Sequence, residues 1–383
     1  MDHKRLFDEI DRLYPEYLRV WEDVCNIESP TNYKEGVDKV GQYFIDMAKA
    51  RGWKIDVFEQ KVAGNAITIT LNPESKNAPV ALSGHIDTVH PIGLFPTPAV
   101  RSDEENIYGP GVTDCKGGVV SSFLAMDALD RCGFGDRPVI LIIQSDEETS
   151  SITSGHETIR YMCERAKGAV AFLNTEGSTR GSVIVARKGI IRYELTVRGI
   201  AGHSSRCYAA SNAIAEAAHK IVELEKMKDM NGLTCNCGVI HGGSVANTVA
   251  DTCIFTADIR FATAKELEWV QNKVKEIASN STVKGCVCEV RQVSMRPAME
   301  KTDANFRLAE KINEINEKVG LPTLALRFGN GGSDAAYTTQ AGIPSVDSIG
   351  VDGDHIHSSR EYAIKASLAY SAKQQAAVAC FIE

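Results

Sequence analysis

The sequence of 383 residues lacks the features that mark several special classes of protein. It has no run of Lys or Arg that could follow a phosphate backbone, and its net charge is -8, so nucleic acid is not an expected partner. No apolar stretch approaches the roughly 18 residues that a bilayer-spanning helix needs. The first 18 residues lack the apolar segment of a secretory signal and are expected to form a surface helix. We therefore expect a soluble protein with no nucleic-acid or membrane partner.

An even, regularly spaced set of cysteines is also missing, which argues against a disulfide framework. The 11 cysteines are scattered, and Cys253, Cys286 and Cys288 lie inside apolar, strand-like runs. Reduced thiols in the cytoplasm fit this distribution. Cys235 and Cys237 form a CxC pair that is compatible with metal or redox chemistry, but strand alternation places both on one face and favours core packing.

The chain is longer than a single hydrophobic core usually supports, so two domains are expected. The first half alternates helical segments with short apolar strands, which predicts an α/β layer with a mostly parallel central sheet flanked by helices. The expected helices are 32–52 and 116–133, and the expected strands are 53–60, 66–72, 78–87 and 137–148. In such a sheet, catalytic loops follow the carboxyl ends of the strands.

The pattern changes at about residue 189 to the order β-α-β-β-α-β, which is typical of a ferredoxin-like unit. The expected strands are 190–200, 233–243, 250–261 and 283–294, and the expected helices are 211–227 and 264–280. The α/β pattern then resumes with a helix over 304–320 and a strand over 323–328. We therefore expect a catalytic domain of residues 1–187 and 293–383, with an inserted lid and dimerisation domain of residues 188–292.

Metal-compatible side chains follow strand-like runs in separate parts of the chain. They occur in SGHIDTVH, GPGVTDCKGG, FLNTEGS, QSDEETS and DGDHIHSSREY. His85 and Asp87 lie two residues apart and point the same way, so the carboxylate can orient a metal-bound imidazole, although an HxD pair alone is weak. Asp114 precedes a helix, where it either caps the helix or reaches a ligand.

Adjacent carboxylates follow the apolar strand that ends near residue 144. Asp146, Glu147 and Glu148 would be costly there unless cations compensate their charge, although an ordinary solvated turn is the alternative. His355 and His357 lie two residues apart and are both candidate ligands, although either one alone could be an ordinary loop histidine.

Taken together and in this order, the motifs resemble those of the zinc amidohydrolase and exopeptidase family. That family includes glutamate carboxypeptidase, peptidase T, succinyl-diaminopimelate desuccinylase, acetylornithine deacetylase and aminoacylase. The resemblance covers nearly the whole chain, including GIAGHSS in the inserted domain. It implies a dinuclear metal-dependent hydrolase that cleaves an amide bond of a small, carboxylate-bearing peptide, as a carboxypeptidase-like metallopeptidase does.

The resemblance also implies a role for each motif residue. One ion would be held by His85 and Glu176, the other by Glu148 and His357, with Asp114 bridging the two; Asp87 would orient His85, and Glu147 would be the general base. His357 is preferred over His355 because the family has a histidine followed by a small residue and then an acidic residue, as in HSSRE. Zinc suits this mixed His and carboxylate set, with manganese or cobalt as alternatives.

The same resemblance places the substrate clamp in and beside the inserted domain. His203, Asn247, Arg260 and Arg187 match positions that hold a substrate carboxylate or a developing oxyanion, because guanidinium groups bind carboxylates bidentately and an imidazole donates to an oxyanion. For Arg260 the alternative is a strand-face salt bridge. In relatives the histidine crosses from a second subunit, which implies a homodimer formed through the inserted domain.

Two other functions compete with a peptidase. One is a deacylase of an N-acyl amino acid or biosynthetic intermediate, and the other is a binding protein that has lost its metals. A binding protein without metals would lack a metal ligand or the general base, and no such residue is missing from the sequence. Cys115, directly after the expected bridging carboxylate, departs from many relatives. Ser333 and Asp334 in the Gly-rich turn are expected to order that turn.

Overall fold

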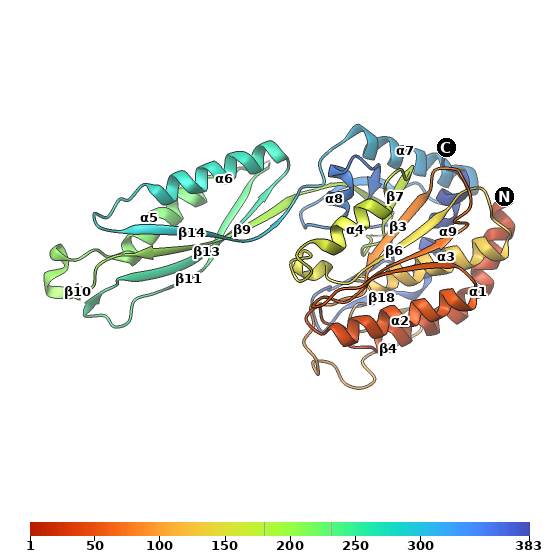
Figure 1. Cartoon of the computed structure of the whole chain (residues 1–383), viewed down its shortest axis with the longest axis horizontal. Coiled ribbons are helices and arrows are strands. Elements are labelled where there is room, and N and C mark those ends of the chain that lie inside the picture. The colour runs from red at the N-terminus through yellow and green to blue at the C-terminus, as the bar shows by residue number, and fades with distance from the viewer. Residues whose placement is uncertain (180, 231) are drawn as a thin grey trace. The chain divides into compact units, whose positions relative to one another are not determined.

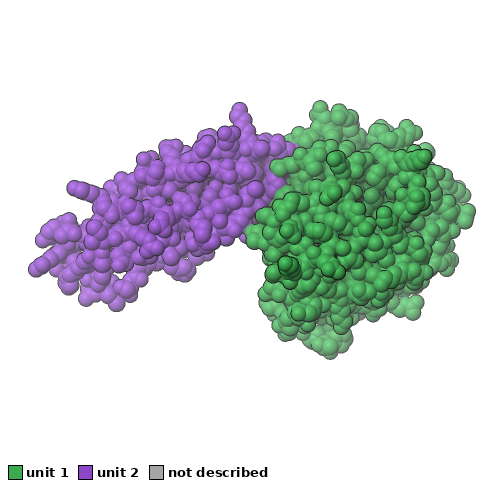
Figure 2. All heavy atoms as spheres, viewed as in Figure 1, with its two compact units in different colours: residues 1–186, 301–328, 333–383 green, residues 187–300, 329–332 purple. Residues whose placement is uncertain are grey.

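The computed structural model describes residues 1–179, 181–230 and 232–383, which divide into two compact units. Unit 1 contains residues 1–186, 301–328 and 333–383, and unit 2 contains residues 187–300 and 329–332. Figure 2 shows the two units in separate colours. Unit 2 is thus an insertion with a second, short contribution from the Gly-rich turn.

The central sheet of unit 1 has six strands in the order β1-β2-β6-β3-β7-β16. Their bounds are Lys54–Phe58 (β1), Ala66–Leu71 (β2), Val139–Gln144 (β6), Val80–His85 (β3), Ala171–Asn174 (β7) and Ser345–Val346 (β16). Strands β6, β3, β7 and β16 are parallel neighbours, whereas β2 is antiparallel to both β1 and β6. The predicted mostly parallel sheet is therefore confirmed.

Helices cover this sheet on both faces (Figure 1). Their bounds are His3–Cys25 (α1), Lys34–Ala50 (α2), Lys116–Arg131 (α3), Glu157–Arg165 (α4), Asp303–Val319 (α7), Ala335–Gln340 (α8) and Lys365–Phe381 (α9). Helix α1 is longer than the expected surface helix and passes through Pro15. It buries Leu13, Tyr17 and Trp21 in the main core, and this apolar packing offsets the backbone hydrogen bond that proline removes.

Two smaller sheets complete unit 1. One has the order β17-β18-β5-β4, with bounds Gly353–Asp354, Tyr362–Ile364, Asn106–Tyr108 and Arg101–Ser102. The other pairs β8 (Ser182–Arg187) with β15 (Ala325–Gly329). The first matters for function because it joins the segment before α3 to the segment before α9.

Unit 2 is built around an antiparallel sheet in the order β11-β13-β9-β14. The elements in chain order are β9 (Gly189–Arg198), α5 (Ala213–Glu225), β11 (Thr234–Gly242), β13 (Thr252–Phe261), α6 (Ala264–Ser279) and β14 (Val287–Arg296). Alternate residues of β9 and β13 are buried, so one face of the sheet packs with the helices. This confirms the predicted β-α-β-β-α-β fold. A short ribbon of β10 (Gly202–His203) and β12 (Thr248–Val249) is added to it.

All 11 cysteines lie in described segments and are unpaired. Cys235 is buried in the core of unit 2, and Cys237 packs against that core, in line with the structural interpretation of the CxC pair. None of the helices in the described ranges is long and apolar enough to cross a membrane.

Candidate metal centre

The central sheet brings the candidate ligands to one edge. His85 is the last residue of β3, Glu147 and Glu148 follow its parallel neighbour β6, and Glu176 follows its other neighbour β7. The carboxyl ends of adjacent parallel strands meet at the same edge of a sheet, so the ends of these three strands deliver the side chains to one place. The remaining two ligands come from the loop before α3 and the loop between β17 and β18.

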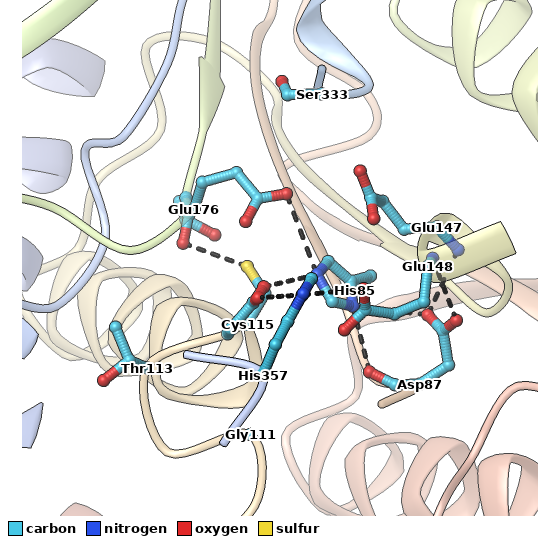
Figure 3. Close-up of polar contacts among 12 residues, drawn as sticks. His85, Asp87, Gly111, Thr113, Cys115, Glu147, Glu148, Glu176, Ser333 and His357 are labelled. Atoms are coloured by element: carbon cyan, nitrogen blue, oxygen red, sulfur yellow. Dashed lines mark hydrogen bonds and ion pairs between the residues drawn. The ribbon is translucent and has the colours of Figure 1, made fainter. Parts of the chain in front are cut away.

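Asp114 lies at the middle of the cluster and contacts one imidazole with each carboxylate oxygen. Its Oδ1 lies 3.0 Å from Nε2 of His85, and its Oδ2 lies 3.0 Å from Nε2 of His357. His85 Nε2 is also 3.7 Å from Glu176 Oε1, and His357 Nε2 is 3.1 Å from Glu148 Oε2. Figure 3 shows the side chains of His85, Glu148, Glu176 and His357 gathered around one place. The cluster therefore has two halves that share Asp114.

Asp87 supports both halves from behind. Its Oδ1 lies 3.3 Å from Nδ1 of His85, whose other ring nitrogen faces Asp114. The two carboxylate oxygens of Asp87 accept the backbone N–H groups of Glu147 and Glu148, each at 3.2 Å. Thr31 donates its hydroxyl to Oδ2 at 2.6 Å. A single buried carboxylate thus orients an imidazole and anchors the turn that carries two acidic side chains.

Glu361 performs a similar task on the other side of the cluster, a role that the HSSRE pattern alone does not predict. Its carboxylate accepts the backbone N–H groups of Gly111 at 3.1 Å, Thr113 at 2.9 Å and Asp114 at 3.0 Å. His90 lies 3.4 Å from the same carboxylate. Glu361 is buried, so it fixes the backbone from which Asp114 projects.

Burial and mutual repulsion control the charges in the cluster. Burial raises the pKa of Glu148 to about 8, and the neighbouring charges of Asp114 and Glu147 act in the same direction. Burial also raises the pKa of Glu176. Hydrogen bonds to Asp114 and Glu148 raise the pKa of His357 to about 10, whereas Asp114, despite its burial, is held at a low pKa by the two imidazoles.

These residues fit divalent metal ions by their chemistry and their burial. The ligand atoms of His85, Asp114 and Glu148 lie within 4.8 Å of one another, as do those of His85, Cys115 and Glu176. Three carboxylates gathered at a buried site are costly unless cations compensate them. The Cys115 thiol donates to the carbonyl of Thr175 at 3.1 Å, so its sulfur already has a structural partner.

The two neighbouring histidines have different surroundings. His357 contacts Asp114 and Glu148, whereas the ring of His355 packs 6.0 Å from the ring of Tyr362. The His357 side chain is 52% exposed, in contrast to 1% for His85. The cluster is therefore open to solvent at His357 and closed at His85.

Two of the clamp residues converge on the Gly-rich turn. Nη1 of Arg260 donates to the carbonyl of Asn330 at 2.7 Å, and Nη1 of Arg187 donates to the carbonyl of Gly331 at 3.5 Å. Arg260 also contacts Asp258, with its Nε 3.2 Å from Oδ1. The strand-face salt bridge that was the alternative for Arg260 is thus present, and it accompanies the contact with the turn.

The other two clamp residues meet at a different place in unit 2. His203 pairs with Thr248 in the β10–β12 ribbon, and the carbonyl of Asn247 accepts the N–H of Ser204 at 3.0 Å. Nδ1 of the exposed His203 accepts the N–H of Ser205 at 3.3 Å. In the neutral ring this leaves the proton on Nε2, which is then a hydrogen-bond donor.

The two pairs lie at opposite ends of the same sheet. Arg260 faces Ile190 at the start of β9, and Thr252, next to the ribbon, faces Arg198 at its end. Eight residues of β13 separate Arg260 from Thr252, about 27 Å at 3.4 Å per residue. One small ligand cannot contact both pairs within a single copy of unit 2.

Comparison with known proteins agrees with this architecture. Residues 185–286 match the peptidase dimerisation domain, and residues 66–228 match peptidase family M28. Carboxypeptidase G2 of Pseudomonas sp. (strain RS-16) is 24% identical over 93% of this chain and 86% of its own length. Acetylornithine deacetylase of Vibrio cholerae is 26% identical over 67% of this chain and 71% of its own length.

Solved structures show the same fold over nearly the whole chain. Aminopeptidase PepT from Bacillus cereus has a TM-score of 0.78 at 22% sequence identity, and the alignment covers 99% of this chain and 98% of that one. The family matches and the relatives confirm the resemblance that the motifs indicate, and the solved structure confirms the fold.

Proposed function

We propose that this chain is a metal-dependent peptidase or amidohydrolase, and more narrowly a dinuclear hydrolase that removes a residue from a small, carboxylate-bearing peptide. The observation that carries this proposal is the contact of Asp114 with one imidazole through each of its two oxygens. A carboxylate placed in this way suits two ions that share it. Carboxypeptidase action is favoured over aminopeptidase action because two guanidinium groups, those of Arg187 and Arg260, are gathered near one turn.

We propose that His85 and Glu176 hold one ion, that Glu148 and His357 hold the other, and that Asp114 bridges them. Zinc is the favoured ion because the set mixes imidazole and carboxylate ligands, with manganese or cobalt as alternatives. Bound divalent ions polarise a carbonyl and lower the pKa of water from 15.7 toward about 7. Asp87 would fix the orientation of one imidazole in this arrangement.

Glu147 is proposed as the general base and acid. The neighbouring Glu148 side chain contacts His357. The negative charge of Glu147 raises the pKa of both Glu148 and Glu176, so the Glu147 carboxylate lies beside the proposed ligands. Its buried carboxylate would accept the proton of the attacking water and return it to the leaving amine. Asp87 positions this residue through its backbone N–H.

The clamp is proposed to be shared between two subunits. Arg187 and Arg260 would bind the substrate carboxylate by bidentate hydrogen bonds, and Nε2–H of His203 would donate to the oxyanion, beside Asn247. Because these pairs lie about 27 Å apart along β13, a site that uses all four requires two copies of unit 2. A homodimer meets this requirement, and the match to a peptidase dimerisation domain supports it. The eleven unpaired cysteines fit a reducing compartment such as the cytoplasm.

The second candidate is hydrolysis of an N-acyl amino acid, favoured by the relationship to an acetylornithine deacetylase. One screen separates the two: the metal-loaded enzyme is assayed on matched dipeptides, C-terminally amidated dipeptides and N-acetyl amino acids. We expect dipeptides with a free carboxylate to be cleaved and the amidated ones to be poor substrates. Turnover of N-acetyl amino acids alone would replace the peptidase by the deacylase.

The same screen with Glu147→Gln tests the reaction itself. This substitution preserves the shape of the side chain and removes the base, so turnover should fall about 100- to 10,000-fold while both ions remain bound. Loss of an ion from Glu147→Gln would instead make Glu147 a ligand.

A further inference from the structure

A second cluster of functional side chains lies on the small sheet of unit 1, apart from the metal ligands. A cavity of about 500 Å³ is lined there by Arg101, Asn106, Tyr108, His355, Arg360, Tyr362 and Ile364. This volume lies within the range of small-molecule sites, roughly 300–1,000 Å³. None of the lining residues belongs to the proposed metal centre or its clamp.

The register of the sheet explains how these side chains come together. Tyr362 of β18 lies opposite Tyr108 of β5, which in turn lies opposite Arg101 of β4. Ile364 lies opposite Asn106 in the next row on the same face. Directly opposed residues point to the same side of a sheet, so the two tyrosines form the floor and Arg101 one wall. The Arg101 guanidinium lies over the Tyr108 ring, 4.0 Å from its centroid.

The charges on this face favour an anion. Within the ranges described, neither Arg101 nor Arg360 has a carboxylate partner, and both are exposed. Two acidic residues of neighbouring segments have other partners: Asp103 accepts the Tyr108 hydroxyl at 2.8 Å, and Asp354 accepts the backbone N–H of His355 at 2.7 Å. Two guanidinium groups around one cavity therefore retain their donors for a ligand.

We propose that this cavity binds a small dianion, with its negative groups held by Arg101 and Arg360 and its body on the two tyrosine rings. The Cα atoms of Arg101 and Tyr362 are separated by two strand spacings, about 10 Å, and Arg360 enters from the segment before β18. Side chains as long as arginine reach the middle of such a span from both sides. The ligand class is a tetrahedral dianion or a dicarboxylate, which share this double negative charge.

The test is calorimetric titration of the metal-loaded full chain with two probes, inorganic sulfate and succinate, at constant ionic strength. We expect saturable binding of at least one probe. Tighter binding of sulfate assigns the site to a tetrahedral dianion, and tighter binding of succinate assigns it to a dicarboxylate. Arg101→Gln and Arg360→Gln should each weaken that binding at least about tenfold, because each removes a charge-assisted hydrogen-bond donor.

Arg307→Gln is the matched control, because Arg307 is an exposed arginine on α7 of the same unit and lies outside the cavity. It should bind the probes as the wild type does. The absence of saturable binding of both probes would overturn the proposal. Equal affinity of the wild type and the Arg101→Gln/Arg360→Gln double variant would also overturn it, provided that the unfolding midpoint of the variant is unchanged. The anion would then bind elsewhere.

Discussion

Removal of the Glu361 carboxylate is the most direct test of how the metal centre is held in place. Three backbone N–H groups, of Gly111, Thr113 and Asp114, donate to this one buried side chain. In Glu361→Ala all three would lose their acceptor in a buried loop. A buried donor without a partner costs about 1–3 kcal/mol. Partial entry of water lowers the sum, so we expect a loss of about 3–5 kcal/mol in the free energy of unfolding of unit 1.

The same substitution should weaken metal binding, because the loop that carries Asp114 would lose its fixed conformation. Glu361→Gln retains one oxygen acceptor and should have a smaller effect on both quantities. Unfolding by urea can be followed by tryptophan fluorescence, since Trp21 and Trp53 are buried in unit 1. Metal affinity is measured by competition with a chelator.

The control is Glu310→Ala, which removes an exposed carboxylate from α7 of the same unit. It should leave the urea midpoint and the metal affinity unchanged. If Glu361→Ala behaved like this control, the carboxylate would not support the loop, and the positioning role assigned to it would be wrong.

Three further predictions concern the metals and the dimer. Asp114→Ala should weaken both ions together, measured as metal content after dialysis, and the loss of one ion alone would remove its bridging role. In the metal-free protein the pKa of His357 is raised to about 10 and that of Glu148 to about 8, so this pair holds protons at pH 7 that metal must displace. Metal affinity should therefore rise with pH from 6 to 8, with proton release detected by calorimetry in buffers of different ionisation enthalpy; a pH-independent affinity would refute this. Mixed dimers of His203→Ala and Glu147→Ala should recover up to half the wild-type activity, because one site per dimer is complete, and no recovery in proven heterodimers would place His203 in its own subunit's site.

Much of the fold could be predicted because local patterns and long-range packing agree. The apolar runs that end near His85 and Gln144 identify two buried strands, and parallel strands place their carboxyl ends at one edge. The alternating burial of β9 and β13 likewise follows from their sequence. The first helix is an exception. The sequence predicts it over residues 1–18, whereas α1 continues to Cys25 because its apolar face stays buried in the core over the last two turns.

The motifs identify the candidate ligands. The hydrogen bonds that hold these ligands in place cannot be predicted from the periodicity of the sequence. The bond from the Asp114 N–H to Glu361 spans 247 residues, and the bond from Thr31 to Asp87 spans 56. Both connect loops whose paths depend on the whole fold. A carboxylate that accepts backbone N–H groups leaves no compositional signature, because any buried acid would look the same in the sequence.

The segment from His355 to Ile364 illustrates why one motif can be interpreted only in part. Glu361, between a turn and the start of β18, accepts the backbone N–H of Asp114, while its neighbours Arg360 and Tyr362 line the outer cavity. The HSSRE pattern identifies the inner residues because it matches a metal site. The outer residues carry no such pattern, and their grouping depends on strands β4 and β5, more than 250 residues earlier in the chain. Neighbouring residues of one short segment thus contribute to two chemically different surfaces, and the grouping of the outer one depends on the pairing of β18 with β5.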